Sequence, residues 1–529
     1  MDQLALLFAL LLGAVVTVPL GERLTVPPPV LMTLLGVVLA LLPFVPNVDI
    51  PPDLILPLVL PPVLYAAVQR TSWRQFATNK RAIFLLAVAL VFVTTAAVAA
   101  VARAVVPGVT PAAAVVLGAL VAPPDPVAAT AVAGRLGLPR RMVSLLEGEG
   151  LFNDVTAIVL YHVALGAAVS GSFSLPGAGV ALVLSAVVAV VTGIAVGWAA
   201  NKLMGLLDDP TLQVGMTLLV PFGAYLLAEE FRGSGVLAVL TAALFLAEHA
   251  VDPDDVLGRL TGNAFWEVVE TLVTGVAFGL IGLELHTLFA TAAGRWSTLI
   301  GAGAAVAGAV VLVRLLWLLP AAWLAKRLHR DRDTEDIPLT WRETVVMWWS
   351  GMRGVASVAL ALAIPFTVDD GGDFPARDEL VFVAFTVVLT TLVLQGLTLP
   401  WLVRRLRVEK DSAAEEALER ELATRVIRAA RERLREIAPA EELSEELVEQ
   451  LNRRVFDLGA WISPDIVDDE RREAHRRRVQ RIKQIQRVHG ELLSAARHEV
   501  LAVRGEPGTD PQVVDRVLRE LDMRSLRLH

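Results

Sequence analysis

Long apolar stretches alternate with short polar connections over roughly the first 405 residues of the chain. A helix needs about 20 mostly apolar residues to cross a bilayer. A window of that length predicts thirteen membrane-spanning helices, near residues 3–20, 28–43, 53–69, 83–106, 111–134, 142–169, 178–201, 212–229, 234–249, 265–287, 298–325, 343–366 and 379–402. The predicted fold class is therefore all-α, in the form of a polytopic membrane protein.

The connections between these helices alternate in charge. The third, fifth and eleventh connections hold the basic clusters, namely Arg70, Arg74, Lys80 and Arg81; Arg135, Arg140 and Arg141; and Lys326, Arg327, Arg330, Arg332 and Arg342. The connection over 43–53 has no Lys or Arg, and that over 367–379 has only Arg377. Because basic loops stay in the cytoplasm, we expect the N-terminus outside the cell membrane and the C-terminal part inside.

Composition supports a membrane protein and excludes other classes. The chain is 55% hydrophobic and only 19% charged, whereas a soluble enzyme of 529 residues would carry more charge and shorter apolar runs, so a soluble enzyme is not expected. It has no cysteine, which excludes disulfides and thiolate chemistry. It also has no glycine-rich phosphate loop ending in Lys-Ser or Lys-Thr, which disfavours an ATP-driven pump.

Charge is concentrated after the last apolar stretch, so residues 1–405 are predicted to form the transmembrane domain and 406–529 a cytoplasmic tail. Leu, Ile and Val recur in the tail at helical spacing, which predicts amphipathic helices over 413–437, 441–462, 468–503 and 511–521. A regulatory or dimerising role is expected. The basic run 471–483 contains interleaved acids, which favours a solvated helix face over binding of anionic lipid or nucleic acid.

Two of the predicted spanning helices are interrupted at their middles. Pro123, Pro124 and Pro126 interrupt the fifth helix, and Gly351 and Gly354 interrupt the twelfth. Unwound backbone at membrane depth persists only where it is buried in protein or lines a watery cavity. Broken helices at corresponding positions of two halves indicate inverted repeats with an ion site at the bilayer midplane.

Acidic residues lie inside the sixth apolar stretch. Glu147, Glu149 and Asp154 accompany Asn153 there, although an ionised side chain at bilayer depth costs several kcal/mol. On a helix Glu149 shares a face with Asn153, while Asp154 lies about 140° away from Glu149. This geometry favours a structural role for one carboxylate and a chemical role for the other.

Arg353 needs an anion at similar depth, and Glu149 is the best candidate, so the sequence predicts a structural Glu149–Arg353 ion pair. Asp154 is then the acid left to bind an ion. Asn153 would offer its amide carbonyl to that ion or hold the neighbouring backbone. Asp125 would either supply a second oxygen or cap a half-helix.

A second buried cation, Arg314, lies in the eleventh apolar stretch. We expect it to pair with Glu267, Glu270 or Glu284, with a role in the ion path as the alternative.

Four strings of residues resemble the monovalent cation/proton antiporters, and most closely the bacterial members of the NhaP/NHE-type branch that carry a C-terminal extension. They are Pro123–Thr130, Leu145–Asp154, Phe265–Glu267 followed by Gly279–Leu285, and Gly351–Ser357, and the resemblance covers about residues 1–405. It implies an NhaA-like fold of inverted repeats, Na⁺/H⁺ exchange by elevator-like motion, and a homodimer. It also implies Asp154 as the carrier of the transported cation and proton, Asn153 as its partner, and Glu149–Arg353 as the buried pair.

The sequence departs from that family at three positions. Family members often have Ser where Gly150 stands, Thr where Pro124 stands and an acid where Ala66 stands. These departures remove possible ligand oxygens and leave the choice between Na⁺ and K⁺ open.

The sequence thus predicts a secondary antiporter that exchanges Na⁺ for H⁺ in contact with membrane lipid, without a cofactor or a nucleic-acid partner. With Asp154 as the single titrating carrier, one cation exchanges for one proton and the cycle is electroneutral. The alternatives are K⁺/H⁺ or mixed exchange, a gated cation channel, and a non-transporting sensor, which the intact Asp154, Asn153 and Arg353 disfavour.

Overall fold

A computed structural model describes residues 3–42, 52–69, 80–171, 175–207, 209–249, 256–291, 294–328, 340–408, 412–463, 469–503 and 510–528. These ranges consist of helices and short connections, with one isolated β-bridge between Thr367 and Asp373. The chain divides into two compact units, Met1–Lys410 and Asp411–His529. The division falls five residues beyond the boundary expected from composition.

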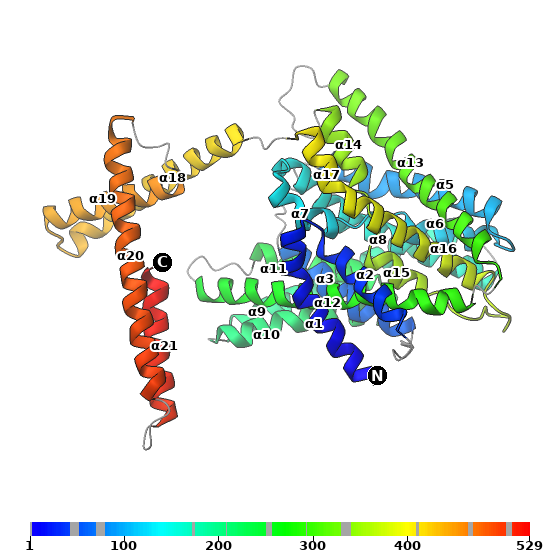
Figure 1. Ribbon diagram of the computed structural model, residues 1–529, viewed down its shortest axis with the longest axis horizontal. Helices are drawn as coiled ribbons and strands as arrows, with labels where there is room; N and C mark the ends of the chain where they lie inside the picture. Colours follow the sequence, from blue (N-terminus) through cyan, green and yellow to red (C-terminus); the bar gives the residue numbers. More distant parts are fainter. Residues whose placement is uncertain are drawn as a thin grey trace. The chain divides into compact units, whose positions relative to one another are not determined.

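The first unit is a bundle of helices (Figure 1). Its elements are α1 (Gln3–Leu24), α2 (Pro28–Ala40), α3 (Pro52–Gln69), the π-helix η1 (Leu85–Ala89), α5 (Leu90–Val105), α6 (Pro111–Val121), α7 (Val127–Leu136), α8 (Arg140–Ser170), α9 (Leu175–Met204), α10 (Pro210–Glu230), α11 (Gly235–His249), α12 (Val256–Thr291), α13 (Trp296–Leu328), α14 (Trp341–Trp349), α15 (Val355–Leu362), α16 (Arg377–Thr390), the π-helix η2 (Thr391–Gln395) and α17 (Gly396–Leu406). Within the described residues, eight helical segments are long and apolar enough to cross a membrane, and four apolar helices are shorter. The all-α polytopic fold is confirmed, while the number of thirteen crossings stays a prediction.

Both interruptions lie where the Pro and Gly residues predict them. Residues 122–126 separate α6 from α7, and residues 350–354 separate α14 from α15. The two unwound segments touch, because the Asp125 N–H donates a hydrogen bond of 2.7 Å to the Met352 carbonyl. Each broken helix therefore contributes two helix ends to one place in the bundle.

Helices of the first unit pack in two groups. One comprises α1–α3 and α9–α12, and the other comprises α5–α8 and α13–α17. Small residues tighten the first group: a Cβ on Gly36 of α2 would overlap the backbone of α12, and one on Gly282 of α12 would overlap α2. Between the groups, α3 and α12 meet α15, and α3 meets α8, so a seam runs beside the two breaks.

The second unit consists of α18 (Ser412–Ala440), α19 (Glu445–Ile462), α20 (Asp469–Val503) and α21 (Pro511–Leu528). The four predicted tail helices are confirmed, and the last one extends seven residues beyond the expected end. Ile427 of α18 packs on Gly459 of α19, and Arg497 of α20 pairs with Asp522 of α21 at 2.7 Å. The side chains of the basic run 471–483 lie outside those that the structure describes.

Candidate ion-binding site

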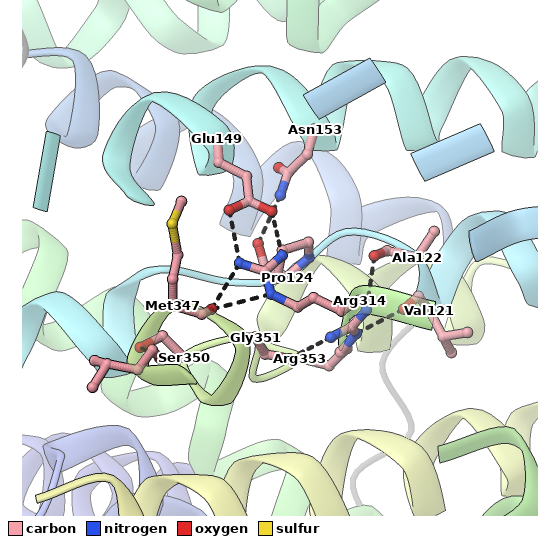
Figure 2. Close-up of polar contacts among 11 residues, drawn as sticks. Val121, Ala122, Pro124, Glu149, Asn153, Arg314, Met347, Ser350, Gly351 and Arg353 are labelled. Carbon is pink, nitrogen blue, oxygen red and sulfur yellow. Dashed lines mark hydrogen bonds and ion pairs between the residues drawn. The ribbon is translucent and has the colours of Figure 1, made fainter. Parts of the chain in front are cut away.

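The acidic stretch lies on α8, which is continuous from Arg140 to Ser170. Glu149 and Asn153 are buried, with 1% and 0% of their surfaces exposed, whereas Asp154 is partly exposed. The two carboxylates therefore have different surroundings, as their angular separation predicts. Glu149 and Asn153 point toward the unwound segments (Figure 2).

Asp154 lines a cavity at the seam between the two helix groups. The walls come from the 122–126 break, α7, α8 and α15 on one side and from α3 and α12 on the other. Its polar lining consists of Asp125, Thr130, Glu147, Asp154, Glu270, Thr274 and Ser357. Asp154 makes no hydrogen bond or ion pair with any residue that the structure describes. A carboxylate in this position is available to an ion or a proton that enters the cavity.

Glu149 pairs with Arg314 of α13, which corrects the expected Glu149–Arg353 pair. The Arg314 guanidinium binds both carboxylate oxygens in a fork, with Nη2 donating to Oε2 at 2.8 Å and Nη1 donating to Oε1 (Figure 2). Arg314 also donates from Nε and Nη2 to the Met347 carbonyl, at 3.3 and 3.2 Å, in the last turn of α14. The expectation that Arg314 pairs with an acid of the tenth stretch is wrong for the same reason.

Arg353 instead binds backbone carbonyls. Its Nε donates to the Val121 carbonyl at 2.9 Å, its Nη2 to the Ala122 carbonyl at 3.0 Å, and its Nη1 to the Gly351 carbonyl (Figure 2). Because Arg353 lies within the break, its side chain folds onto the C-terminal end of α6. There it satisfies carbonyls that lack helical partners and neutralises their partial negative charge.

Asp125 caps helix N-termini, whereas Arg353 binds a helix C-terminus. Its Oδ1 accepts a hydrogen bond of 2.8 Å from the Val127 N–H at the start of α7, and the Val355 N–H at the start of α15 donates to the same carboxylate. A Cβ on Gly354 would overlap this carboxylate, so the glycine permits the close approach. Of the two roles expected for Asp125, the structure shows the helix cap, on two helices at once, and it also places Asp125 in the cavity.

Asn153 holds the backbone of the first break. Its Nδ2 donates to the Pro124 carbonyl at 2.8 Å, while its Oδ1 is buried and has no hydrogen-bond partner among the described residues. Pro124 thus contributes a carbonyl to the break, although it has no side-chain oxygen. Gly150, another departure from the family, faces the ring of Pro126, which a Cβ would overlap. Ala66 is buried in α3, with 2% of its surface exposed.

Sequence reasoning missed two features of this site. One is the role of Arg314, for which the available signal was that two arginines, Arg314 and Arg353, lie inside apolar stretches and either could pair with Glu149. The other is the α12 side of the cavity, where Glu270 and Thr274 face the same space as Asp154. Their four-residue spacing predicts a shared helix face, but nothing in the sequence indicates what that face meets.

Comparisons with known proteins find a matching family model, relatives in sequence and a similar fold. The family model described as "Sodium/hydrogen exchanger, transmembrane" matches residues 7–405. The chain is 33% identical to an uncharacterized Na⁺/H⁺ exchanger of Mycobacterium tuberculosis, over 99% of this chain and 96% of that protein. It is 28% identical to a sodium, potassium, lithium and rubidium/H⁺ antiporter of Bacillus subtilis, over 71% of this chain and 57% of that protein. The fold is similar to that of the sodium proton antiporter MjNhaP1 of Methanocaldococcus jannaschii, with a TM-score of 0.59, 20% identity, and coverage of 76% and 98% of the two chains.

Proposed function

Because this chain belongs to the sodium/hydrogen exchanger family, we propose that it exchanges Na⁺ for H⁺ across the membrane, with Asp154 as the shared carrier of cation and proton. The observation that supports this role most directly is the placement of Asp154. It lines the cavity at the seam without a partner among the described residues, whereas Glu149 on the same helix is bound by Arg314.

A proton and a cation compete for the Asp154 carboxylate because of its surroundings. Removal from water disfavours the charged carboxylate, so Asp154 must bind either a proton or a cation in order to cross a low-dielectric barrier. Asp125, Thr130 and Ser357 lie in the same cavity and offer further oxygens to a cation, which prefers such hard ligands. Asn153 supports the site by holding the Pro124 carbonyl.

The seam supports an elevator-like cycle. In this proposal the group that contains α8 and both breaks moves against the group that contains α3 and α12, carrying Asp154 from one side of the membrane to the other. The Arg314 and Arg353 contacts tie α6, α8, α13 and α14 together, so the broken helices can move as one body.

The arrangement in the membrane also remains a proposal. From the loop charges, the N-terminus lies outside the plasma membrane and the second unit lies in the cytoplasm as a regulatory domain. We further propose a homodimer. The exposed apolar surface of α9 supports a dimer interface. Only 11% of the apolar window of this helix is buried, which is the smallest share among the eight long apolar helices.

Proteoliposomes that contain a pH-sensitive dye test the function. An imposed Na⁺ gradient is expected to drive proton movement, and the same assay with K⁺ determines the cation preference. A K⁺/H⁺ exchanger would respond to K⁺ in preference to Na⁺. Cation flux without obligatory proton counterflow would contradict antiport and indicate a channel.

A further inference from the structure

A second cavity opens beside the one that contains Asp154. It is lined from α1, α2, α7 and α12, at the Glu22 end of α1 and the Pro28 end of α2. Three residues line both cavities: Val127, Glu270 and Thr274. In the proposed orientation, the connection between α1 and α2 is cytoplasmic, so the second cavity lies on the cytoplasmic approach to Asp154.

Thr274 is unusual at this junction. Its side chain is buried, with 8% of its surface exposed, and its Oγ1 has no hydrogen-bond partner among the described residues. A helical threonine can donate to the carbonyl four residues earlier, as Thr33 and Thr391 do here. A buried polar atom without a partner costs free energy, and this one lies where two cavities meet, so a ligand there would satisfy it.

Glu270 lies one turn before Thr274 on the same face of α12, and its Oε2 atom is also buried. Across the first cavity stands Glu147 of α8, two turns before Asp154. A carboxylate and a hydroxyl that face one space form a ligand set for a hard monovalent cation.

We propose that Glu270 and Thr274 form a second binding station for the transported monovalent cation, at the junction of the two cavities on the cytoplasmic side of Asp154. The station belongs to α12, in the helix group opposite the one that carries Asp154, and it passes the cation to or from the carrier. This assignment deepens the proposed function and rests on it for the identity of the cation.

Na⁺ binding in the absence of the carrier tests the station directly, because a ligand that binds only the folded protein raises Tm. Purified Asp154→Asn protein is expected to retain a rise in Tm with NaCl that choline chloride does not produce. Adding Glu270→Gln or Thr274→Val to Asp154→Asn is expected to abolish the rise, while adding Glu267→Gln or Thr271→Val, whose positions line only the second cavity, preserves it. If NaCl does not raise the Tm of Asp154→Asn protein more than choline chloride does, the proposed second cation site is wrong.

Transport kinetics in an otherwise wild-type chain supply a second measurement. Thr274→Val is expected to raise the KM for Na⁺ on the cytoplasmic face about two- to tenfold, and Glu270→Gln by more than about tenfold, with kcat nearly unchanged. Thr274→Ser restores the hydroxyl and is expected to restore the KM. A wild-type KM in both Thr274→Val and Glu270→Gln overturns the proposal. If the wild-type protein shows no exchange but Na⁺ still raises the Tm of Asp154→Asn protein, the second cation site is supported and the proposed antiport function is wrong.

Discussion

Glu149 and Asp154 lie five residues apart on α8, and their partners separate their roles. Glu149 is buried and bound in a fork by Arg314, so its charge is fixed in place. Asp154 faces a cavity without a partner among the described residues. The sequence predicts this division from the angle between the two side chains, and the partner of Glu149 decides which acid is structural.

The first residue-scale prediction is that Asp154→Asn abolishes exchange and leaves a folded, membrane-inserted protein. A neutral amide cannot alternate between a proton and a cation, and Asn fits the space of Asp. Dye-based proton movement in proteoliposomes measures the loss, with the exposed Asp378→Asn as a matched control that keeps wild-type activity. Substantial Na⁺-driven proton movement by folded Asp154→Asn protein would remove Asp154 from the carrier role.

A double-mutant cycle tests the corrected ion pair. Glu149→Ala and Arg314→Ala should each destabilise the protein by about 3–5 kcal/mol, because each leaves a buried charge without its partner. The double variant should recover part of that loss, which gives a large coupling free energy. The cycle of Glu149→Ala with Arg353→Ala is the control and should show weaker coupling. Equal coupling in the two cycles would show that Arg314 is not the specific partner.

The predicted Glu149–Arg353 pair was wrong because the sequence indicates the depth of a charged residue in the membrane but not its partner. Position within an apolar stretch gives the depth of a charge in the membrane, and Arg314, Arg353 and Glu149 have similar depths. Depth does not give the direction in which a side chain points around the bundle. Since Arg353 lies on unwound backbone, no helical period describes its direction, and its nearest acceptors are the carbonyls at the end of α6.

At the scale of elements, four helix ends meet at the two breaks and each receives a group of suitable charge. Asp125 caps the N-terminal ends of α7 and α15, where N–H groups lack partners. Arg353 and Arg314 bind carbonyls at the C-terminal ends of α6 and α14. The partial positive charge of a helix N-terminus favours the carboxylate of Asp125, and the partial negative charge of a helix C-terminus favours the two arginines. The sequence predicts both breaks from Pro and Gly, but not which ion faces which end.

The close approach of Asp125 to Gly354 gives an element-scale prediction. Gly354→Ala places a methyl group into the Asp125 carboxylate, so the caps on α7 and α15 must shift. We expect a loss of about 1–3 kcal/mol in stability and a severe reduction in exchange rate. Gly301→Ala is the control, since a Cβ there meets nothing within 4 Å. Wild-type exchange by Gly354→Ala would show that the cap tolerates displacement.

In the whole molecule, the hydropathy of the sequence predicts which residues form helices, but it does not predict how the helices of the first unit divide into two packing groups. Hydropathy marks which residues avoid water and not which helices touch. The assignment of α3 and α12 to one group depends on small residues and ring contacts, such as Gly36 against α12 and Tyr65 against Trp266 at 4.5 Å between ring centroids. The cavity that contains Asp154 exists because these groups meet along a seam, so its α12 wall could not be predicted.

The proposed homodimer predicts cross-linking through α9. Val180, Leu184, Val187, Val191 and Ile194 form an exposed apolar stripe at helical spacing. The chain has no cysteine, so Val187→Cys introduces a single thiol. We expect oxidation in membranes to give a dimer band, whereas Phe92→Cys, equally exposed on α5 in the other helix group, should remain monomeric. Cross-linking through both positions alike would indicate random collision.

The last prediction concerns the charge moved in one complete cycle. Asp154 is neutral with a bound proton and neutral with a bound monovalent cation. In this scheme Glu149 stays paired with Arg314, and Asp125 keeps one charge state through the whole cycle while it caps α7 and α15. The carrier group therefore crosses the membrane with the same net charge in both directions, and one Na⁺ exchanges for one proton.

Exchange should then be insensitive to voltage. The measurement is Na⁺/H⁺ exchange in proteoliposomes whose membrane potential is clamped with K⁺ and valinomycin, and the rate and end-point should not change with the imposed potential. A systematic shift would show that a second proton crosses with the carrier. Asp125 and Glu147 would be the candidate sites, because both are acids of the moving helix group that line the cavity with Asp154. Loss of the shift in Asp125→Asn would assign the second proton to that carboxylate, since Asn keeps a side-chain oxygen for the Val127 N–H but cannot titrate.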